Sequence, residues 1–339
     1  MAEASGSAVD GAGAAVDRSA EPPLISVVLP TFNRPRCLRE AVASVFQQTV
    51  SDWELIIADD GSGPETVDYL RALRDPRITV VWLQHCGNPG RVRNAAMRAA
   101  RGRYLAFLDS DDCWAAQKLE KQVAALRTAP DRRWCYTAIA HVDQDGQPAP
   151  SVERAPWIPY EGDILAPLLE LRALVATPTV LVERALVESA GGFDEGLLFC
   201  EYLDLWIRLA TRSPVAVVDE PLVRVRDQRD RYSANRAGDY EGQVRLFGKL
   251  AHTLVDPDQR AIARRRRAAA ALVLAGIHVD AGRRLQVGRT LGEAARFGWR
   301  YPDWWWSAAK TATRALLPLP WLALWRSSRA SHGHPRQSG

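Results

Sequence analysis

The sequence predicts an α/β protein with a mainly parallel sheet, followed by a region made only of helices. Between residues 25 and 127, short apolar strands alternate with amphipathic helical segments, which is the pattern of βαβ units. Clusters of acidic and polar residues come directly after two of these strands, where open parallel sheets bind their ligands. Beyond residue 240 the apolar positions recur with helical spacing alone.

Each element of the predicted sheet follows from its residues. The first strand covers 25–30, a short β-branched run that stops at a proline. The second and fourth strands are apolar runs that stop at aspartates, and the third is rich in β-branched residues. We expect strands at 25–30, 54–58, 78–83 and 104–108, and helices at 36–48, 65–73, 91–101 and 115–127.

The second half of the α/β domain mixes strands with shorter helices. Its predicted strands are 134–141, 179–182 and 215–218. Residues 143–160 contain five prolines and glycines, and we expect them to form an excursion over the ligand site. The helices expected in the C-terminal region are 240–255, 258–280 and 283–298.

The chain of 339 residues is long enough for one large domain and an appendage. Residues 1–23 are rich in Ala, Gly and Ser and lack the apolar core of a secretory signal, so we expect a disordered leader. We place the α/β domain at 24–230, a basic helical region rich in tryptophan at 231–326, and a disordered tail at 327–339.

Charge is distributed unevenly along the chain. Residues 1–221 carry 22 basic against 31 acidic side chains, whereas residues 222–339 carry 22 against 9. A basic C-terminal third suggests an anionic partner, either a membrane surface or a polyphosphate ligand. No recognised nucleic-acid-binding motif accompanies this charge, so we do not expect nucleic acid as a partner. The five scattered cysteines argue against a disulfide framework or a zinc site and fit the reducing cytoplasm.

The segment 299–326 combines clustered tryptophans with arginines. Its longest uninterrupted apolar run is about eleven residues, far short of the roughly twenty that a membrane-spanning helix needs. Tryptophans beside arginines suit a membrane interface, so we expect peripheral contact with the inner face of the cytoplasmic membrane. The alternative is a helical subdomain that packs these tryptophans on the rest of the chain or on a partner chain.

Two acidic clusters stand at predicted strand ends. Asp59-Asp60-Gly61-Ser62 closes the second strand, and Asp109-Ser110-Asp111-Asp112 closes the fourth. Carboxylates this close repel one another unless something compensates their charge. A hard divalent cation such as Mg²⁺ or Mn²⁺ would do so, because it prefers oxygen ligands and usually shares them with phosphates. The alternative is that these aspartates cap turns and helices.

The order of the motifs resembles family 2 glycosyltransferases, which have the GT-A fold. The resemblance covers about residues 25–226. The motifs that carry it are, in order, Ser26-Val-Val-Leu-Pro-Thr-Phe-Asn33, Ala43-Ser-Val-Phe-Gln-Gln-Thr49, Trp53-Glu-Leu-Ile-Ile-Ala-Asp-Asp-Gly-Ser62, Arg93-Asn94, Gly102-Arg-Tyr-Leu-Ala-Phe-Leu-Asp-Ser-Asp-Asp112 and Gly191-Gly-Phe-Asp-Glu195. It implies an inverting glycosyltransferase of the hexosyltransferase type that uses a nucleoside diphosphate sugar, in polysaccharide biosynthesis at the cell envelope.

The resemblance also implies a role for each matching residue. On the donor side, Asp60 would accept a hydrogen bond from the base, Asp109 would lie by the ribose, and Asp111 would ligate a metal that bridges the diphosphate. We take Asp109 as a second metal ligand and Asp194 as a residue on the acceptor side. The remaining donor-site residues implied are Pro30, Thr31, Asn33, Arg93 and Asn94.

The sequence departs from the family at the catalytic base. Inverting transfer needs a base that takes the proton of the acceptor hydroxyl. The family usually places an aspartate where this chain has Tyr202, and a neutral phenol with a pKa near 10 is a poor base. Glu201 and Asp204, which share a helical face, are the candidates that remain, with a weak or inactive enzyme as the third explanation.

The sequence is therefore consistent with two functions. The first is metal-assisted transfer from a UDP-sugar to a glycan or a lipid-linked acceptor. The second, motivated by Tyr202, is a non-catalytic scaffold or regulator that binds a nucleotide sugar. A nucleotidyltransferase would need a Gly-rich loop bearing Arg or Lys after the first strand, and residues 30–35 do not form one.

Overall fold

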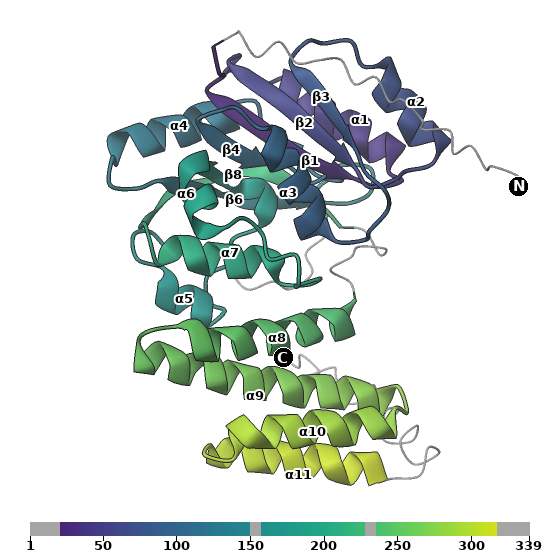
Figure 1. Cartoon of the computed structure of the whole chain (residues 1–339), viewed down its shortest axis with the longest axis vertical. Helices are drawn as coiled ribbons and strands as arrows, with labels where there is room; N and C mark the ends of the chain where they lie inside the picture. Colours follow the sequence, from purple (N-terminus) through teal and green to yellow (C-terminus); the bar gives the residue numbers. More distant parts are fainter. Residues whose placement is uncertain (1–20, 150–156, 228–234, 317–339) are drawn as a thin grey trace, which may run out of the picture. The chain divides into compact units, whose positions relative to one another are not determined.

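A computed structural model describes residues 21–149, 157–227 and 235–316 (Figure 1). The leader expected up to residue 23 lies mostly outside these residues, and the tail expected at 327–339 lies wholly outside them. The chain divides into two compact units. The first consists of residues up to 141, 176–189 and 218–226, and the second of residues 142–175, 190–217 and 227 onward. Each unit is described by itself.

The first unit contains most of the sheet and the helices that flank it (Figure 1). It holds the greater part of the strands β6 and β8, which continue into the second unit. Its elements are β1 (Ile25–Thr31), α1 (Pro35–Phe46), β2 (Trp53–Asp59), α2 (Pro64–Ala72), β3 (Ile78–Trp82), α3 (Pro89–Ala99), β4 (Tyr104–Phe107), β5 (Cys113–Trp114), α4 (Lys118–Thr128), β6 (Trp134–Val142), a 3₁₀ turn (Thr177–Thr179), β7 (Leu181–Glu183), α6 (Arg184–Ala190) and β8 (Val215–Arg226).

The sheet has eight strands in the order β3-β2-β1-β4-β7-β6-β8-β5. The strands β3, β2, β1 and β4 are parallel, as predicted. From β7 onward the recorded pairings of β4 with β7, β7 with β6 and β8 with β5 are antiparallel, so the sheet is mixed. Because β1, β2 and β4 are parallel neighbours, their carboxyl ends lie at one edge, where Thr31 and Asp59 are register partners.

The parallel strands form the core of the first unit. Val27, Val28 and Leu29 in β1 have no exposed surface, and neither have residues 55–58 in β2. Strands buried on both faces are expected where helices cover a parallel sheet, and α3 packs on both β1 and β2. This rigid core places the loops that follow β1, β2 and β4.

A fully buried lysine lies at the start of α4. Lys118 has no exposed surface, its Nζ donates to Oε1 of Gln122 at 2.6 Å, and it lies 4.2 Å from the centroid of the Trp114 ring. Burial disfavours the ammonium form and lowers the pKa of Lys118 from 10.5 to about 7. The lysine therefore lowers the free energy of unfolding at neutral pH relative to alkaline pH.

The substitution Lys118→Met is expected to change how stability depends on pH. Between pH 7 and 10.5 the unfolded chain binds a proton at Lys118 that the folded chain has released, so stability rises with pH in this window. Lys118→Met should have a higher free energy of unfolding than the wild type at pH 7. This difference between variant and wild type should be smaller by about 2 kcal/mol at pH 9. Urea denaturation at both values measures this, with the half-exposed Lys121→Met as control. An advantage that does not change with pH would contradict the lowered pKa.

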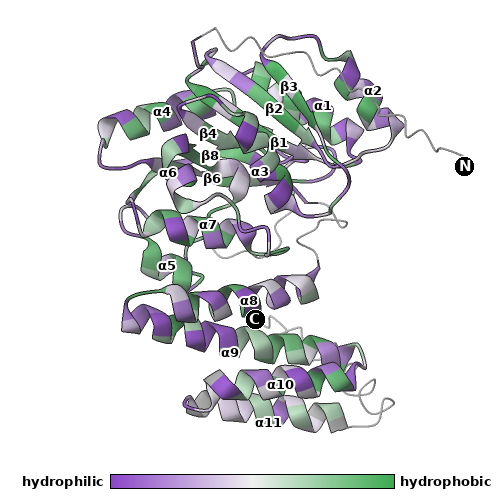
Figure 2. Ribbon diagram, viewed as in Figure 1, coloured by the Kyte–Doolittle hydropathy of each residue, from purple (hydrophilic) through white to green (hydrophobic). Residues whose placement is uncertain are grey.

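The second unit consists mainly of helices. They are α5 (Leu165–Leu169), α7 (Glu201–Ala210), α8 (Arg236–Thr253), α9 (Pro257–Asp280), α10 (Arg284–Gly298) and α11 (Pro302–Leu316). Figure 2 shows apolar and polar residues alternating along α8 to α11. The predicted helices at 240–255, 258–280 and 283–298 correspond to α8, α9 and α10. The helix α11 was not among the predicted elements, and its start at Pro302 suits proline's preference for the first turn.

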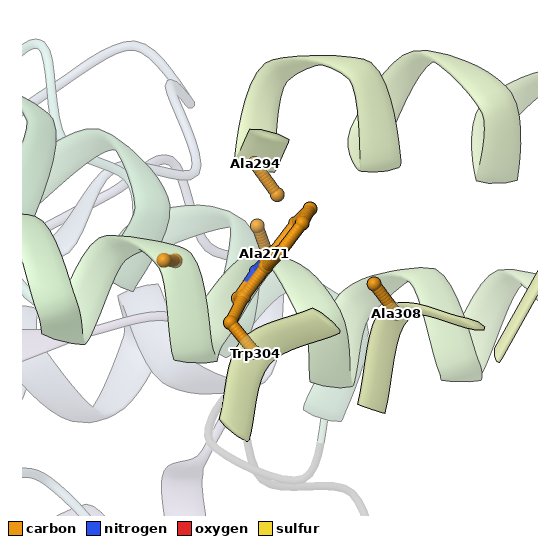
Figure 3. Close-up of a cluster of buried hydrophobic side chains, with 5 residues drawn as sticks. Ala271, Ala294, Trp304 and Ala308 are labelled. Atoms are coloured by element: carbon orange, nitrogen blue, oxygen red, sulfur yellow. The ribbon is translucent and has the colours of Figure 1, made fainter. Parts of the chain in front are cut away.

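One tryptophan of the C-terminal region belongs to the core. Figure 3 shows the indole of Trp304 among Ala271 of α9, Ala294 of α10 and Ala308 of α11. Small residues on three helices leave room for one large ring, which joins the helices. In the part of the chain that the structure describes, no helix combines the length and the apolar character that crossing a bilayer requires.

Candidate functional site

Asp60, directly after β2, organises the loop that follows β3. Its two carboxylate oxygens accept hydrogen bonds from the backbone N–H groups of Cys86 and Gly87, both at 2.9 Å, and Oδ2 lies 3.0 Å from Nδ1 of His85. The adjacent Gly61 has φ +76°, and a Cβ there would lie 2.8 Å from the backbone nitrogen of His85, so a glycine is required. A carboxylate has about four lone-pair sites, so Asp60 keeps capacity for one more donor.

An aromatic pair stands beside Asp60 that the sequence reasoning missed. The rings of Phe32 and His85 stack with centroids 4.1 Å apart and planes at 17°. Phe32 is 39% exposed in the loop after β1. The only signal in the sequence was its place between Thr31 and Asn33, two residues predicted to line the donor pocket.

Asn33 and Thr31 have different surroundings. Asn33 has φ +50°, its Oδ1 accepts from the N–H of Gly63 at 2.7 Å, and its own N–H donates to Oγ of Ser62 at 2.9 Å. It therefore ties the loops after β1 and β2 together. Oγ1 of Thr31 and Oδ1 of Asp59 are buried and lack a hydrogen-bond partner within the described residues. Pro30 precedes them in β1.

Arg93 and Asp109, both predicted on the donor side, are in contact. Nη2 of Arg93 lies 2.7 Å from Oδ1 of Asp109. Arg93 is buried in α3, whose N-terminus is capped by Oδ1 of Asn88, while the Asp109 side chain is 27% exposed. Asn94 follows Arg93 in α3 and is half-buried. The structure thus brings the helix after β3 to the loop after β4.

The other two aspartates of this loop contact arginines that the sequence analysis did not single out. Asp111 forms an ion pair with Arg34, and its side chain is 10% exposed. Oδ1 of Asp112 accepts from the backbone N–H of Arg226 at 3.1 Å. The buried Arg226 side chain donates to the carbonyl oxygen of Asp111 at 3.3 Å and forms an ion pair with Glu40. Arginines therefore offset much of the repulsion in the acidic cluster.

These residues fit a divalent cation that shares its ligands with a substrate. Asp109, which is partly exposed, and Asp111, which is buried, offer carboxylate oxygens, the donors that Mg²⁺ and Mn²⁺ prefer, and each is paired with one arginine. The described residues contain no group of three or more His, Cys, Asp or Glu side chains placed to hold a metal. A cation at Asp109 and Asp111 would take its other ligands from a diphosphate and from water.

In the second unit, two predicted site residues belong to one ion-pair cluster, in which Asp204 is buried and its partners are partly exposed. Asp204 has no exposed surface and accepts from Nε of Arg208 at 2.8 Å and from Nζ of Lys249 at 2.8 Å. The same Nζ donates to Asp194 at 2.7 Å, and Asp194 also accepts from the N–H of Gly196 at 2.9 Å. Burial acts to raise the pKa of Asp194, but the hydrogen bonds from Lys249 and Gly196 outweigh it and lower that pKa.

Comparison with known proteins shows which proteins this chain is similar to. Residues 26–175 match the model of the family described as Glycosyl transferase family 2. Over these residues the chain is similar to glycosyl transferase family 2. It is 36% identical over 167 residues to the putative teichuronic acid biosynthesis glycosyltransferase TuaG of Bacillus subtilis, covering 48% of this chain and 63% of TuaG.

Another glycosyltransferase is similar over a shorter stretch. The UDP-Glc:alpha-D-GlcNAc-diphosphoundecaprenol beta-1,3-glucosyltransferase WfgD of Escherichia coli is 36% identical over 103 residues, which cover 30% of this chain and 41% of WfgD. The chain therefore spans about two fifths to three fifths of the length of these two relatives.

Solved structures confirm the GT-A type of fold. S. aureus TarS 1–349 in complex with UDP-GlcNAc aligns with a TM-score of 0.64 at 18% identity, over 86% of this chain and 89% of that one. Mannosyltransferase PcManGT from Pyrobaculum calidifontis, in complex with GDP-Man and Mn²⁺, aligns with a TM-score of 0.56 at 19% identity, over 91% of this chain and 84% of that one.

Where the resemblance to family 2 glycosyltransferases leads one to expect an aspartate, this chain carries a tyrosine that cannot serve as a base near neutral pH. Tyr202 is half-buried in the first turn of α7, and burial raises the pKa of its phenol further above 10. Glu201 is the first residue of α7 and is 5% exposed, where the helix N-terminus favours a carboxylate. Asp204, with both oxygens bonded and no exposed surface, fits a structural role.

Proposed function

We propose that the chain is an inverting glycosyltransferase that moves a sugar from a nucleoside diphosphate sugar to a glycan or glycolipid acceptor. One observation carries the proposal. Asp60 follows β2, and Asp109 and Asp111 follow β4, the two strands that pair with β1 on either side in the parallel part of the sheet, within the residues that match the family model. A nucleoside diphosphate needs a hydrogen-bond acceptor for its base and positive charge for its phosphates. Asp60 would supply the hydrogen-bond acceptor, and a cation bound by Asp109 and Asp111 would supply the positive charge.

On the donor side, a uracil suits the surroundings of Asp60. The imide N–H of the base would donate to the remaining lone pairs of Asp60, and the exposed ring of Phe32 offers a face for stacking. The buried hydroxyl of Thr31 would find a partner in the nucleoside, with Pro30 and Asn33 shaping the same pocket. A UDP-sugar donor also agrees with the names of WfgD and of the TarS complex.

The diphosphate would lie by Arg93, Asn94, Asp109 and Asp111. Mg²⁺ or Mn²⁺ bound by the two aspartates would neutralise charge on the departing diphosphate. The guanidinium of Arg93 and that of Arg34, each now paired with one of these aspartates, would also face the phosphates. The complex of PcManGT with GDP-Man and Mn²⁺ supports this arrangement.

The acceptor side is proposed to use Glu201 as the base that takes the proton of the attacking hydroxyl. Asp194 would lie on this side, held by its bonds to Lys249 and Gly196. A lipid-linked acceptor agrees with the diphosphoundecaprenol substrate in the name of WfgD, and an envelope polysaccharide with the name of TuaG.

A direct test is to incubate the purified chain with UDP-, GDP- and dTDP-sugars, Mn²⁺ and a lipid-linked glycan, and to measure release of nucleoside diphosphate. We expect turnover with a UDP-sugar, and none after EDTA treatment. A chain that binds UDP tightly but turns over no donor would instead support a non-catalytic nucleotide-sugar-binding scaffold, the candidate that Tyr202 motivates.

The helices α10 and α11 are proposed to bind the inner face of the cytoplasmic membrane. Trp299, Trp305 and Trp306 are 55%, 54% and 82% exposed, and the Arg300 guanidinium lies 5.0 Å from the Trp299 ring centroid. Exposed tryptophans beside cationic side chains are typical of segments that lie in a lipid interface. Trp321 and Trp325, which the sequence analysis included in this segment, lie outside the described residues.

Replacing both Trp305 and Trp306 by serine is expected to weaken binding to vesicles that contain anionic lipid by about tenfold, because two interfacial anchors are lost. Cosedimentation at moderate salt measures this binding. The matched control is Trp82→Ser, which removes a 44% exposed tryptophan from the first unit. Equal binding by the double variant and the wild type would contradict the membrane proposal.

A further inference from the structure

The ammonium group of Lys249 connects the loop that contains Asp194 with α7, the helix that begins with Glu201. It comes from α8 and bonds Asp194, which precedes Glu201 by seven residues, and Asp204, which lies in the same helix as Glu201. With Arg208, the cluster contains two carboxylates and two cations, so its charges balance. Asp204 is fully buried, so removing one of the two cations that bond it is costly, because its charge then has only Arg208 to compensate it. Lys249 is therefore needed to hold the two aspartates together.

The backbone just before Glu201 lies against α8 at contact distance. A Cβ at Gly242 would lie 2.8 Å from the carbonyl oxygen of Phe199 and 2.9 Å from its carbonyl carbon. A Cβ at Gly238, one turn earlier, would lie 2.3 Å from the Phe199 ring. Only glycine permits this approach, so α8 acts as the surface on which the turn into α7 is built.

The turn itself is strained. Cys200, between Phe199 and Glu201, has φ +63°, a conformation that non-glycine residues adopt at a cost. Its Sγ lies 3.6 Å from Oδ1 of Asp239, again on α8. A strained residue persists only where its surroundings over-determine it, and here α8 supplies the surroundings.

We propose that Lys249 and Gly242 of α8 are positioning residues for Glu201, so that the C-terminal helical region is a working part of the transferase. This inference rests on the proposed function, in which Glu201 is the base. Small displacements of a reacting group lower the rate strongly, and a residue on another helix acts on catalysis by this route. The donor-side residues all belong to the first unit, so donor binding should not depend on these contacts.

The first test replaces Lys249 by methionine, which keeps the length of the side chain and removes its charge. We expect kcat to fall at least about tenfold while the KM for the donor and the Kd for UDP stay unchanged. Lys249→Arg should recover most of kcat, because it restores a cation between the two aspartates. The control is Arg245→Met, which changes an exposed cation one turn earlier on the same helix.

The second test replaces Gly242 by alanine, which forces the Phe199 backbone away from α8. Hydrogen exchange of peptides covering residues 194–206 should become faster, and kcat should fall with the donor KM unchanged. The matched control is Gly276→Ala in α9, where a Cβ meets nothing within 4 Å. This variant should match the wild type in both measurements.

The outcomes separate this inference from the function on which it rests. If Lys249→Met and Gly242→Ala keep the exchange pattern and a kcat within twofold of the wild type, the positioning role is overturned. If exchange over 194–206 accelerates but the wild type transfers no sugar, the proposed function fails, while the structural role of α8 is supported. If Lys249→Met does not fold, Lys249→Arg and Gly242→Ala still decide the question through kcat and donor KM.

Discussion

The substitution Asp111→Asn is expected to lower kcat/KM for sugar transfer by about 10²- to 10³-fold, the largest loss on the donor side. Asparagine keeps the size of the side chain but removes the negative charge that a divalent cation needs. The readout that does not depend on turnover is calorimetry of UDP binding. Mn²⁺ should tighten UDP binding to the wild type and should have no such effect on Asp111→Asn.

The control for this variant is Asp131→Asn, an exposed aspartate in the turn before β6. It should leave both kcat/KM and the Mn²⁺ effect unchanged. The ion pair between Arg34 and Asp111 makes the opposite result informative. If UDP binds equally well with EDTA and with Mn²⁺, and Asp111→Asn keeps its activity, arginines supply the positive charge and the metal proposal is wrong.

The substitution Glu201→Gln is expected to lower kcat by about 10³-fold and to leave the donor KM unchanged. The amide occupies the same space but cannot take the proton of the acceptor hydroxyl. The pH profile gives a second readout. The kcat of the wild type should fall at acidic pH because the base becomes protonated, and the residual kcat of Glu201→Gln should not show this fall. Steady-state kinetics from pH 5 to 8 with the best donor measure both effects.

Two companion variants decide between the explanations of the missing aspartate. Asp204→Asn removes the charge that Arg208 and Lys249 contact, so it should lower the free energy of unfolding by roughly 1–3 kcal/mol, since both cations are partly exposed. Tyr202→Asp restores the family's usual residue. If the wild type is silent and Tyr202→Asp is active, the chain is a non-catalytic binding protein and Glu201 is not its base.

The strand and helix pattern of the first unit was predictable because it depends on local residues. An apolar run followed directly by acidic residues marks the end of a parallel strand, and this predicted Asp60, Asp109 and Asp111 at one edge. The direction of β7 was not predictable, because a strand of alternating or apolar residues has the same pattern whichever way its neighbour runs. The mixed half of the sheet therefore appears only in the structure.

The helix α11 shows another limit of local patterns. A cluster of four tryptophans between 299 and 306 predicted an interface but did not distinguish membrane from core. The structure divides them, with Trp304 buried against alanines and Trp306 82% exposed. Which face of a helix is covered depends on the neighbouring helices, and these are not encoded in the segment itself.

The sequence by itself determined the class of the fold, the resemblance to family 2 glycosyltransferases, the two acidic clusters and the presence of Tyr202 where that resemblance leads one to expect the base. Only the tertiary structure decided which charges meet: Arg34 with Asp111, Arg93 with Asp109, and Lys249 with Asp194 and Asp204. The physical reason is the separation along the chain over which each kind of interaction acts. Strand and turn preferences act between near neighbours in the chain, whereas ion pairs form between residues that folding brings together across dozens of positions.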